Sequence, residues 1–196
     1  FYRNNGIWSE GQRITNPIIP TSSQFGADIE LQNSTLIISD TLSYYDFALP
    51  YTEYKINGNI FIYKLVDDVW TYTQNLISPN KVLDAQFGYS ISFENDLLLI
   101  GEPGPEDQLT ELGKAYLYLF NHDTELWEAK QTLEFPDLVN PDENPHFGTQ
   151  VLLQDGMMFI LSSDNPLQDN RTSNVSFING LVTQFREVDS EWVYND

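Results

Sequence analysis

Three Phe-Gly pairs divide the sequence into units of nearly equal length, and this repetition limits the fold more than any other feature. The pairs begin at Phe25, Phe87 and Phe147, which lie 62 and 60 residues apart. In each unit the pair is followed by a glycine that opens a predicted strand, and then by a tryptophan. These residues are Gly58 and Trp70, Gly113 and Trp127, and Gly180 and Trp192. A fixed period of this length is typical of repeat architectures, in which one supersecondary unit recurs.

The first half of each unit predicts a strand, a tight turn and a second strand. Apolar residues alternate at Ile29 and Leu31, and the other two units repeat this alternation, which indicates strands with one buried face. Two-residue turns of Asn, Asp, Ser or Gly follow, and Asn, Asp and Gly tolerate the positive φ of a tight hairpin. The turns are Asn33-Ser34, Asn95-Asp96 and Asp155-Gly156. The continuous apolar runs after them are typical of strands buried on both faces. These runs are Leu36–Ile38, Leu97–Ile100 and Met157–Leu161.

The second half of each unit predicts two further strands, so that each unit forms one four-stranded antiparallel sheet. Segments rich in aromatic and β-branched residues follow the second glycine, and short acidic turns lead from them to the tryptophan. We therefore predict an all-β fold of tandem four-stranded blades of the β-propeller type. The expected boundaries are 25–86, 87–146 and 147–196 for the three blades. Residues 1–24 would supply the last strand of a preceding blade, at Gly6–Ile14, and its connection.

Three blades and one extra strand are expected to be part of a larger propeller, so that residues 1–196 form a partial one. A single blade cannot bury both of its faces without neighbours. The alternative is an open array that completes itself against another copy or another chain.

The order of these motifs resembles the FG-GAP repeat of integrin-α-type β-propellers. The middle unit carries the resemblance best, with Phe87-Gly88 and Gly101-Glu102-Pro103 in the diagnostic places. The outer units depart from the second motif and have Ser39-Asp40-Thr41 and Leu161-Ser162-Ser163 instead. The resemblance implies an extracellular or cell-surface protein. It also implies that ligands bind at the face from which the second-to-third-strand loops emerge.

The charge of the chain excludes two classes of partner. The formal net charge is −20, from 29 acidic and 9 basic residues. Nucleic acids and anionic membranes bind proteins through lysine and arginine, so we expect neither as a partner. No apolar run approaches the ~20 residues of a membrane span, and membrane insertion of this segment is not expected. Cysteine is absent, so the sequence offers no thiolate chemistry.

The sequence predicts no cofactor. Many members of the resembled family bind calcium in D-x-D-x-D-G loops between the first and second strands. Calcium needs six to eight oxygen ligands from a loop that wraps around it. The corresponding segments here are tight hairpins without spaced carboxylates, which argues against calcium. Three N-glycosylation sequons, at Asn33, Asn170 and Asn174, fall in predicted turns or loops.

The candidate ligand-binding residues lie in the second-to-third-strand loops. Aromatic residues with polar tips are favoured at recognition surfaces, and the loop of the second blade is acidic. The candidates are Tyr44, Tyr45, Phe47, Tyr51, Tyr54, Glu102, Glu106 and Asp107. The competing interpretation is that the aromatic residues pack locally and that the acidic loop is only solvated.

These observations predict a non-enzymatic extracellular or cell-surface module that binds proteins or glycans, or mediates adhesion. One alternative is a structural subunit of a filament or surface coat, assembled through blade faces. Another is the propeller domain of a hydrolase or lyase. The enzyme is disfavoured because His122 and His146 share no catalytic spacing, and they are interpreted as a surface residue and a structural residue. No catalytic or metal-binding residue is predicted.

Overall fold

The computed structural model describes residues 2–18, 24–41, 58–80, 82, 84–105, 113–135, 146–163 and 180–195. In this part of the chain the regular structure is entirely β. No helix there is long and apolar enough to cross a membrane.

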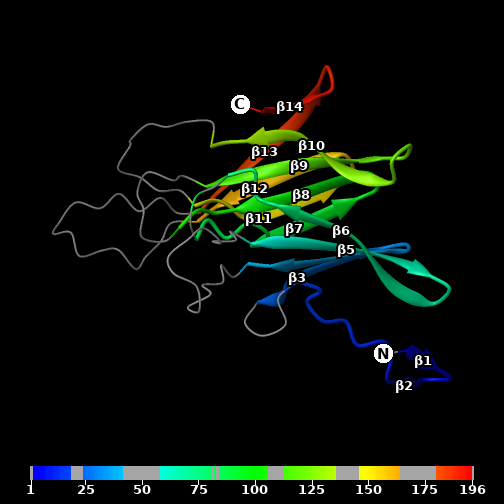
Figure 1. Ribbon diagram of the computed structural model, residues 1–196. Coiled ribbons are helices and arrows are strands. Elements are labelled where there is room, and N and C mark those ends of the chain that lie inside the picture. The colour runs from blue at the N-terminus through cyan, green and yellow to red at the C-terminus, as the bar shows by residue number, and fades with distance from the viewer. Residues whose placement is uncertain are drawn as a thin grey trace.

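Three four-stranded antiparallel sheets follow one another along the chain, as the sequence predicted (Figure 1). We call them blades 1, 2 and 3. Blade 1 contains β3 (Phe25–Gln32), β4 (Thr35–Asp40), β5 (Asn59–Val66) and β6 (Val69–Ile77). Blade 2 contains β7 (Ser90–Glu94), β8 (Leu97–Glu102), β9 (Lys114–Asn121) and β10 (Leu126–Leu133). Blade 3 contains β11 (Phe147–Gln154), β12 (Met157–Ser162), β13 (Leu181–Val188) and β14 (Glu191–Tyr194).

Each blade is a simple meander in which every strand pairs with the next one in sequence. The first and second strands are joined by the predicted two-residue turns. Asn33, Asn95 and Asp155 adopt φ values of 54°, 56° and 52° there. The turns between the third and fourth strands lie at the same end of the sheets, which we call the turn end. The opposite end, where β4, β8 and β12 finish, is called the connection end.

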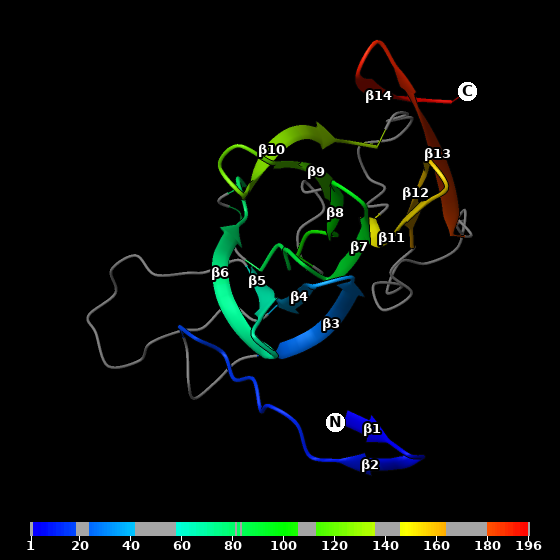
Figure 2. The same ribbon diagram turned by 90° about the vertical axis from the view of Figure 1, so that its right-hand side faces the viewer.

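The blades pack side by side, with the first strands β3, β7 and β11 as neighbours (Figure 2). Polar side chains on one first strand accept hydrogen bonds from the backbone of the next. Asp28 accepts from the amide of Ile91 at 2.8 Å, and Ser90 accepts from the amide of Val151 at 3.1 Å. The described sheets do not close into a ring.

Two hydrophobic cores lie between the blades. The prediction that the second strands are buried on both faces is confirmed for β4 and β8 but is wrong for β12, where Met157 is 42% exposed and only one face is fully buried. The core between blades 1 and 2 includes Leu98 and Ile100 with Ile37 of the preceding blade. The core between blades 2 and 3 includes Leu99 with Ile160 of the following blade. Trp127 and Trp192, which recur at equivalent positions of the repeat, are buried in these cores.

The alternation in β3 predicted a buried face, and this prediction is wrong for blade 1. Ile29 and Leu31 are 55% and 59% exposed, whereas the equivalent Ile91 and Val151 are 3% and 5% exposed. The reason is that burial of this face requires a neighbouring blade. Among the described residues no other sheet covers this face of β3.

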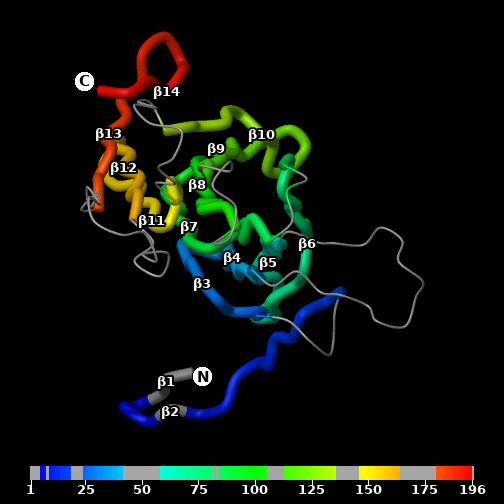
Figure 3. Tube along the Cα trace, turned by 90° about the vertical axis from the view of Figure 1, so that its left-hand side faces the viewer, coloured from blue at the N-terminus to red at the C-terminus, as the bar shows by residue number. Residues whose placement is uncertain are grey.

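The predicted strand Gly6–Ile14 is also corrected. Only Ile7–Ser9 (β2) is a strand, and it pairs with Tyr2–Asn4 (β1) in a separate hairpin (Figure 3). The extended residues after β2 nevertheless behave as the end of a fourth strand does in the other blades. Gln12 exchanges two hydrogen bonds with the backbone of Trp70. Ile14 packs against a third hydrophobic cluster, which Ile38, Phe61 and Tyr63 form in blade 1.

Candidate functional site

The candidate site is a group of polar side chains around Glu102, at the connection end of blade 2. Of the predicted ligand-binding residues, only Glu102 lies among the described residues. The other seven lie outside them: Tyr44, Tyr45, Phe47, Tyr51, Tyr54, Glu106 and Asp107. The sequon residues Asn170 and Asn174 also lie outside the described part, whereas Asn33 occupies an exposed turn.

Glu102 does not lie in an exposed loop, where the sequence analysis placed it. It is the last residue of β8 and is 1% exposed. The hydroxyl of Tyr116, on the neighbouring strand β9, donates a hydrogen bond to Oε1 of Glu102 at 3.0 Å. The hydroxyl of Ser78 is hydrogen-bonded to Oε2. The carboxyl group is therefore held by side chains from two other segments, β9 and the residues that follow β6.

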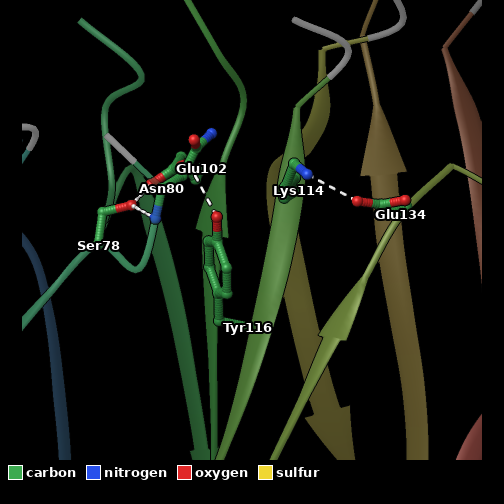
Figure 4. A network of polar contacts seen from close by, with 6 residues as sticks. All are labelled: Ser78, Asn80, Glu102, Lys114, Tyr116 and Glu134. Carbon is green, nitrogen blue, oxygen red and sulfur yellow. Dashed lines mark hydrogen bonds and ion pairs between the residues drawn. The ribbon is translucent and has the colours of Figure 1, made fainter. Parts of the chain in front are cut away.

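Ser78 belongs to the segment that joins blade 1 to blade 2, so Glu102 fastens this connection to blade 2 (Figure 4). The hydroxyl of Ser78 also accepts a hydrogen bond from the backbone amide of Asn80, at 3.0 Å. Further along the connection, the carbonyl of Ala85 accepts a hydrogen bond from the amide of Gly104, at 3.1 Å. The path of the connection is thus fixed at both of these points by the end of β8.

Blade 1 uses its equivalent residue in the same way. Asp40 ends β4 as Glu102 ends β8, and it is fully buried. Its carboxylate accepts hydrogen bonds from the side chain of Asn16 at 2.6 Å and from the backbone amide of Gln24 at 2.9 Å. Both donors belong to the segment that leads into blade 1. A buried acid at the end of the second strand therefore anchors the incoming connection in two of the blades.

Burial dominates the electrostatics of Glu102. Desolvation raises the pKa of its carboxyl group to about 7, although hydrogen bonds from Ser78, Tyr116 and Asn80 and the charge of Lys114 act in the opposite direction. Desolvation also raises the pKa of Tyr116 well above its ordinary value, and the nearby Glu102 adds to the effect. The pKa of Tyr118 rises to about 12 for the same two reasons. Near neutral pH, Glu102 is therefore the group in this site that gains or loses a proton.

Lys114 lies directly opposite Glu102 in the pairing of β8 with β9. Its ammonium group is nevertheless bonded to Glu134, at 2.6 Å, as Figure 4 shows. Glu134 is the first residue after β10 and begins the connection to blade 3. The side chains of Lys114 and Glu134 are 31% and 65% exposed, so this ion pair is close to solvent.

The Phe-Gly pair of blade 3 contacts the Gly-x-Pro motif of blade 2 across the interface between the two blades. A Cβ atom on Gly101 would lie 2.0 Å from the carbonyl oxygen of Gly148, and one on Gly148 would lie 2.4 Å from that of Lys114. Gly148 belongs to the Phe-Gly pair of blade 3, and Gly101 belongs to the Gly-x-Pro motif of blade 2. This contact explains why both positions need glycine.

The histidines occupy opposite ends of the blades. His122 is exposed at the turn end, with Nε2 2.8 Å from Oδ2 of Asp96, as expected for a surface residue. His146 is buried, with Nδ1 3.3 Å from the carbonyl oxygen of Pro103. In the described part of the chain no three His, Cys, Asp or Glu side chains are grouped to hold a metal ion.

Sequential four-stranded meanders that pack through their first strands define a module of the β-propeller type. Comparison with known families refines this description. Residues 70–118 match a family model described as FG-GAP repeat. The matched segment includes most of β6, all of β7 and β8 and part of β9, with both Phe87-Gly88 and Gly101-Glu102-Pro103. The resemblance drawn from these motifs is therefore confirmed for this part of the chain. No curated protein matches the sequence.

Proposed function

We propose that this chain is part of a propeller-type module, located outside the cell or at its surface, that binds protein or glycan partners and has no enzymatic role. The observation that supports this proposal best is the asymmetry of the blades. All the turns between paired strands at the turn end are short, whereas residues 41–58, 103–113 and 163–180 join strands at the connection end. Binding residues tend to lie on loops that a rigid scaffold positions.

The strand ends from which these connections leave the sheets are buried, and two of them are held by hydrogen bonds. The connections start from Asp40, Glu102 and Ser162, which are all buried. Glu102 and Asp40 are hydrogen-bonded to segments that enter from the preceding side, so the strand ends are fixed relative to one another. A partner that contacts two blades would therefore bind connections whose attachment points on the sheets are already fixed, which reduces the entropy lost on binding.

The five aromatic residues of the first connection allow a direct test. The purified protein, fluorescently labelled, would be applied to a glycan array and to intact cells. Replacement of Tyr44, Tyr45, Phe47, Tyr51 and Tyr54 by serine is expected to lower binding at least about tenfold, because aromatic anchors supply much of the energy of such interfaces.

A matched control lies at the turn end, where Val66 and Val69 are both exposed apolar residues. Their replacement by serine should leave binding unchanged. Equal losses in the two variants would contradict the proposed binding face. Absence of binding to both the array and the cells would contradict the binding role itself.

A structural role in an assembly built through blade faces is the second candidate. The exposed Ile29 and Leu31 of β3 favour it, because contiguous apolar surface often marks a protein interface. Light scattering coupled to size exclusion separates the two roles. A mass equal to one chain at every concentration would rule out obligate assembly, whereas a mass that grows with concentration would support it.

A further inference from the structure

Glu102 and Lys114 together hold both connections of blade 2. Ser78, from the connection that enters the blade, is bonded to Glu102, and Glu134, from the connection that leaves it, is bonded to Lys114. Glu102 and Lys114 are themselves direct partners across β8 and β9. Side chains of directly opposed residues in antiparallel strands lie on one face, with Cβ atoms ~4.5–5.5 Å apart. The lysine side chain can therefore reach either carboxyl group.

The two carboxyl groups that surround Lys114 differ strongly in their contact with water. Glu134 is mostly exposed, and ion pairs between exposed side chains are weak because water solvates both partners well. Glu102 is buried, so its ionised form gains far more from a neighbouring positive charge. Loss of the proton from Glu102 should therefore make it the better partner for Lys114.

Within the described part of the chain, the other charged or titratable groups around Glu102 do not provide a competing cation. On β9 they are Tyr116 and Tyr118, which remain neutral in this pH range because burial raises the pKa of both phenols. The incoming connection carries Asp84, which is exposed. His146, from the segment before β11, is bonded to the carbonyl oxygen of Pro103. Lys114 is the cation that acts on Glu102.

We propose that Glu102 controls, through its proton, which carboxylate Lys114 binds. While Glu102 is protonated, Lys114 stays on Glu134 and holds the outgoing connection. When Glu102 releases its proton to solvent, Lys114 turns to Glu102 and releases Glu134. A change in pH near neutrality would then alter the attachment of the connection between blades 2 and 3.

Nuclear magnetic resonance can follow both partners of this exchange in the intact chain, with ¹³C in the glutamate carboxyl groups and ¹⁵N in the lysine amines. The Glu102 carboxyl signal is expected to move with a midpoint near pH 7, and the Lys114 signal is expected to move at the same midpoint. In Glu102→Gln the Lys114 step near neutral pH should disappear. A Lys114 signal that does not change while Glu102 titrates would overturn the proposal.

Two further variants test the competition between the carboxylates. Glu134→Gln removes the competing partner, so the midpoint of Glu102 should fall by about one pH unit. Lys114→Met removes the cation, so the midpoint should rise by a similar amount. Glu128→Gln is the matched control, because Glu128 is exposed on β10, the strand that leads to Glu134, but lies near the turn end. An unchanged midpoint in Glu134→Gln would show that Lys114 does not move between the two groups.

Discussion

Gln131 and Trp192 are 61 residues apart in the sequence, and they exchange two hydrogen bonds. The side-chain amide of Gln131 donates to the carbonyl of Trp192 at 2.7 Å, and its oxygen accepts from the amide of Trp192 at 2.9 Å. Gln74 holds Trp127 in the same way. Each of these glutamines thus joins the outermost strand of its own blade to the outermost strand of the next.

Replacement of Gln131 by methionine, which has a similar size, should weaken this junction. Both backbone groups of Trp192 lose a partner in a partly buried place, and we expect a loss of about 1–2 kcal/mol in the free energy of unfolding. Urea unfolding monitored by tryptophan fluorescence measures it. Gln12→Met is the control, because its bonds to Trp70 are exposed and water can replace them. Equal losses in the two variants would argue against the role of burial.

The contact between Gly148 and the backbone of blade 2 leads to a second prediction. Gly148→Ala would place a Cβ atom 2.4 Å from a carbonyl oxygen, and relief of this clash requires blades 2 and 3 to separate. We expect the variant to lose more than about 3 kcal/mol of stability, or to fail to fold.

Gly26 provides the matched control for this substitution. It occupies the same position in blade 1 with nearly the same φ, 91° against 94°. A Cβ atom added to Gly26 would have no atom of the described residues within 4 Å, apart from its chain neighbours. Gly26→Ala should therefore cost only the backbone strain of a positive φ, about 1–2 kcal/mol. Thermal unfolding followed by circular dichroism compares the two. Similar losses in the two variants would show that the positive φ, and not the contact between blades, is the reason why position 148 needs glycine.

The raised pKa of Glu102 predicts a stability that falls as the pH rises. The folded-state pKa of about 7 exceeds the ordinary value of 4.5, so the folded protein binds this proton more tightly than the unfolded chain. The stability that the protonated Glu102 carboxyl group contributes to the fold is fully present below pH 4.5 and is lost as the pH rises through 7. The difference amounts to about 3 kcal/mol.

Glu102→Gln should remove this dependence, because glutamine keeps the shape of the neutral carboxyl group and does not ionise. We expect the variant to be more stable than the parent by about 3 kcal/mol at about pH 8 and by less than about 1 kcal/mol at about pH 5. Urea unfolding at both pH values makes the comparison, with Glu128→Gln as the exposed control. A constant difference at the two pH values would contradict the assignment of the titration to Glu102.

Tyr116→Phe removes the hydroxyl that donates a hydrogen bond to Glu102, and its effect on stability should depend on pH in a different way. The bond favours the ionised carboxylate, so its loss should raise the pKa of Glu102 further. The cost in stability is expected to be about 1–2 kcal/mol at about pH 8 and smaller at about pH 5. Tyr72→Phe, at a partly exposed tyrosine of blade 1, should show no such difference between the two pH values.

The strand order and the turns could be predicted from the sequence because they depend on local patterns. Alternation, positive-φ turn residues and the Phe-Gly period each act within one unit, and the register of β7 with β8 follows from them. The exposure of Ile29 could not be predicted in this way. The same alternation is buried at Ile91 only because another blade packs on it, and a pattern within one unit carries no information about its neighbour.

The candidate site was only partly predictable for a related reason. Glu102 was selected because it falls in the acidic segment between the second and third strands of blade 2, which was interpreted as a loop. Its burial depends on Ser78 and Tyr116, which come from other segments and are brought together by the packing of blades. One signal was present in the sequence: Asp40 holds the equivalent position in blade 1, so an acid recurs at the end of the second strand.

The uncovered face of β3 has a practical consequence for anyone who purifies this chain. Environment-sensitive dyes that fluoresce on apolar surfaces should adsorb to Ile29 and Leu31 while the protein is fully native. A dye-based melting curve would then begin from a bright baseline and conceal the transition. Emission from Trp127 and Trp192, whose rings leave the interior only when the blades come apart, would report the same event without this background.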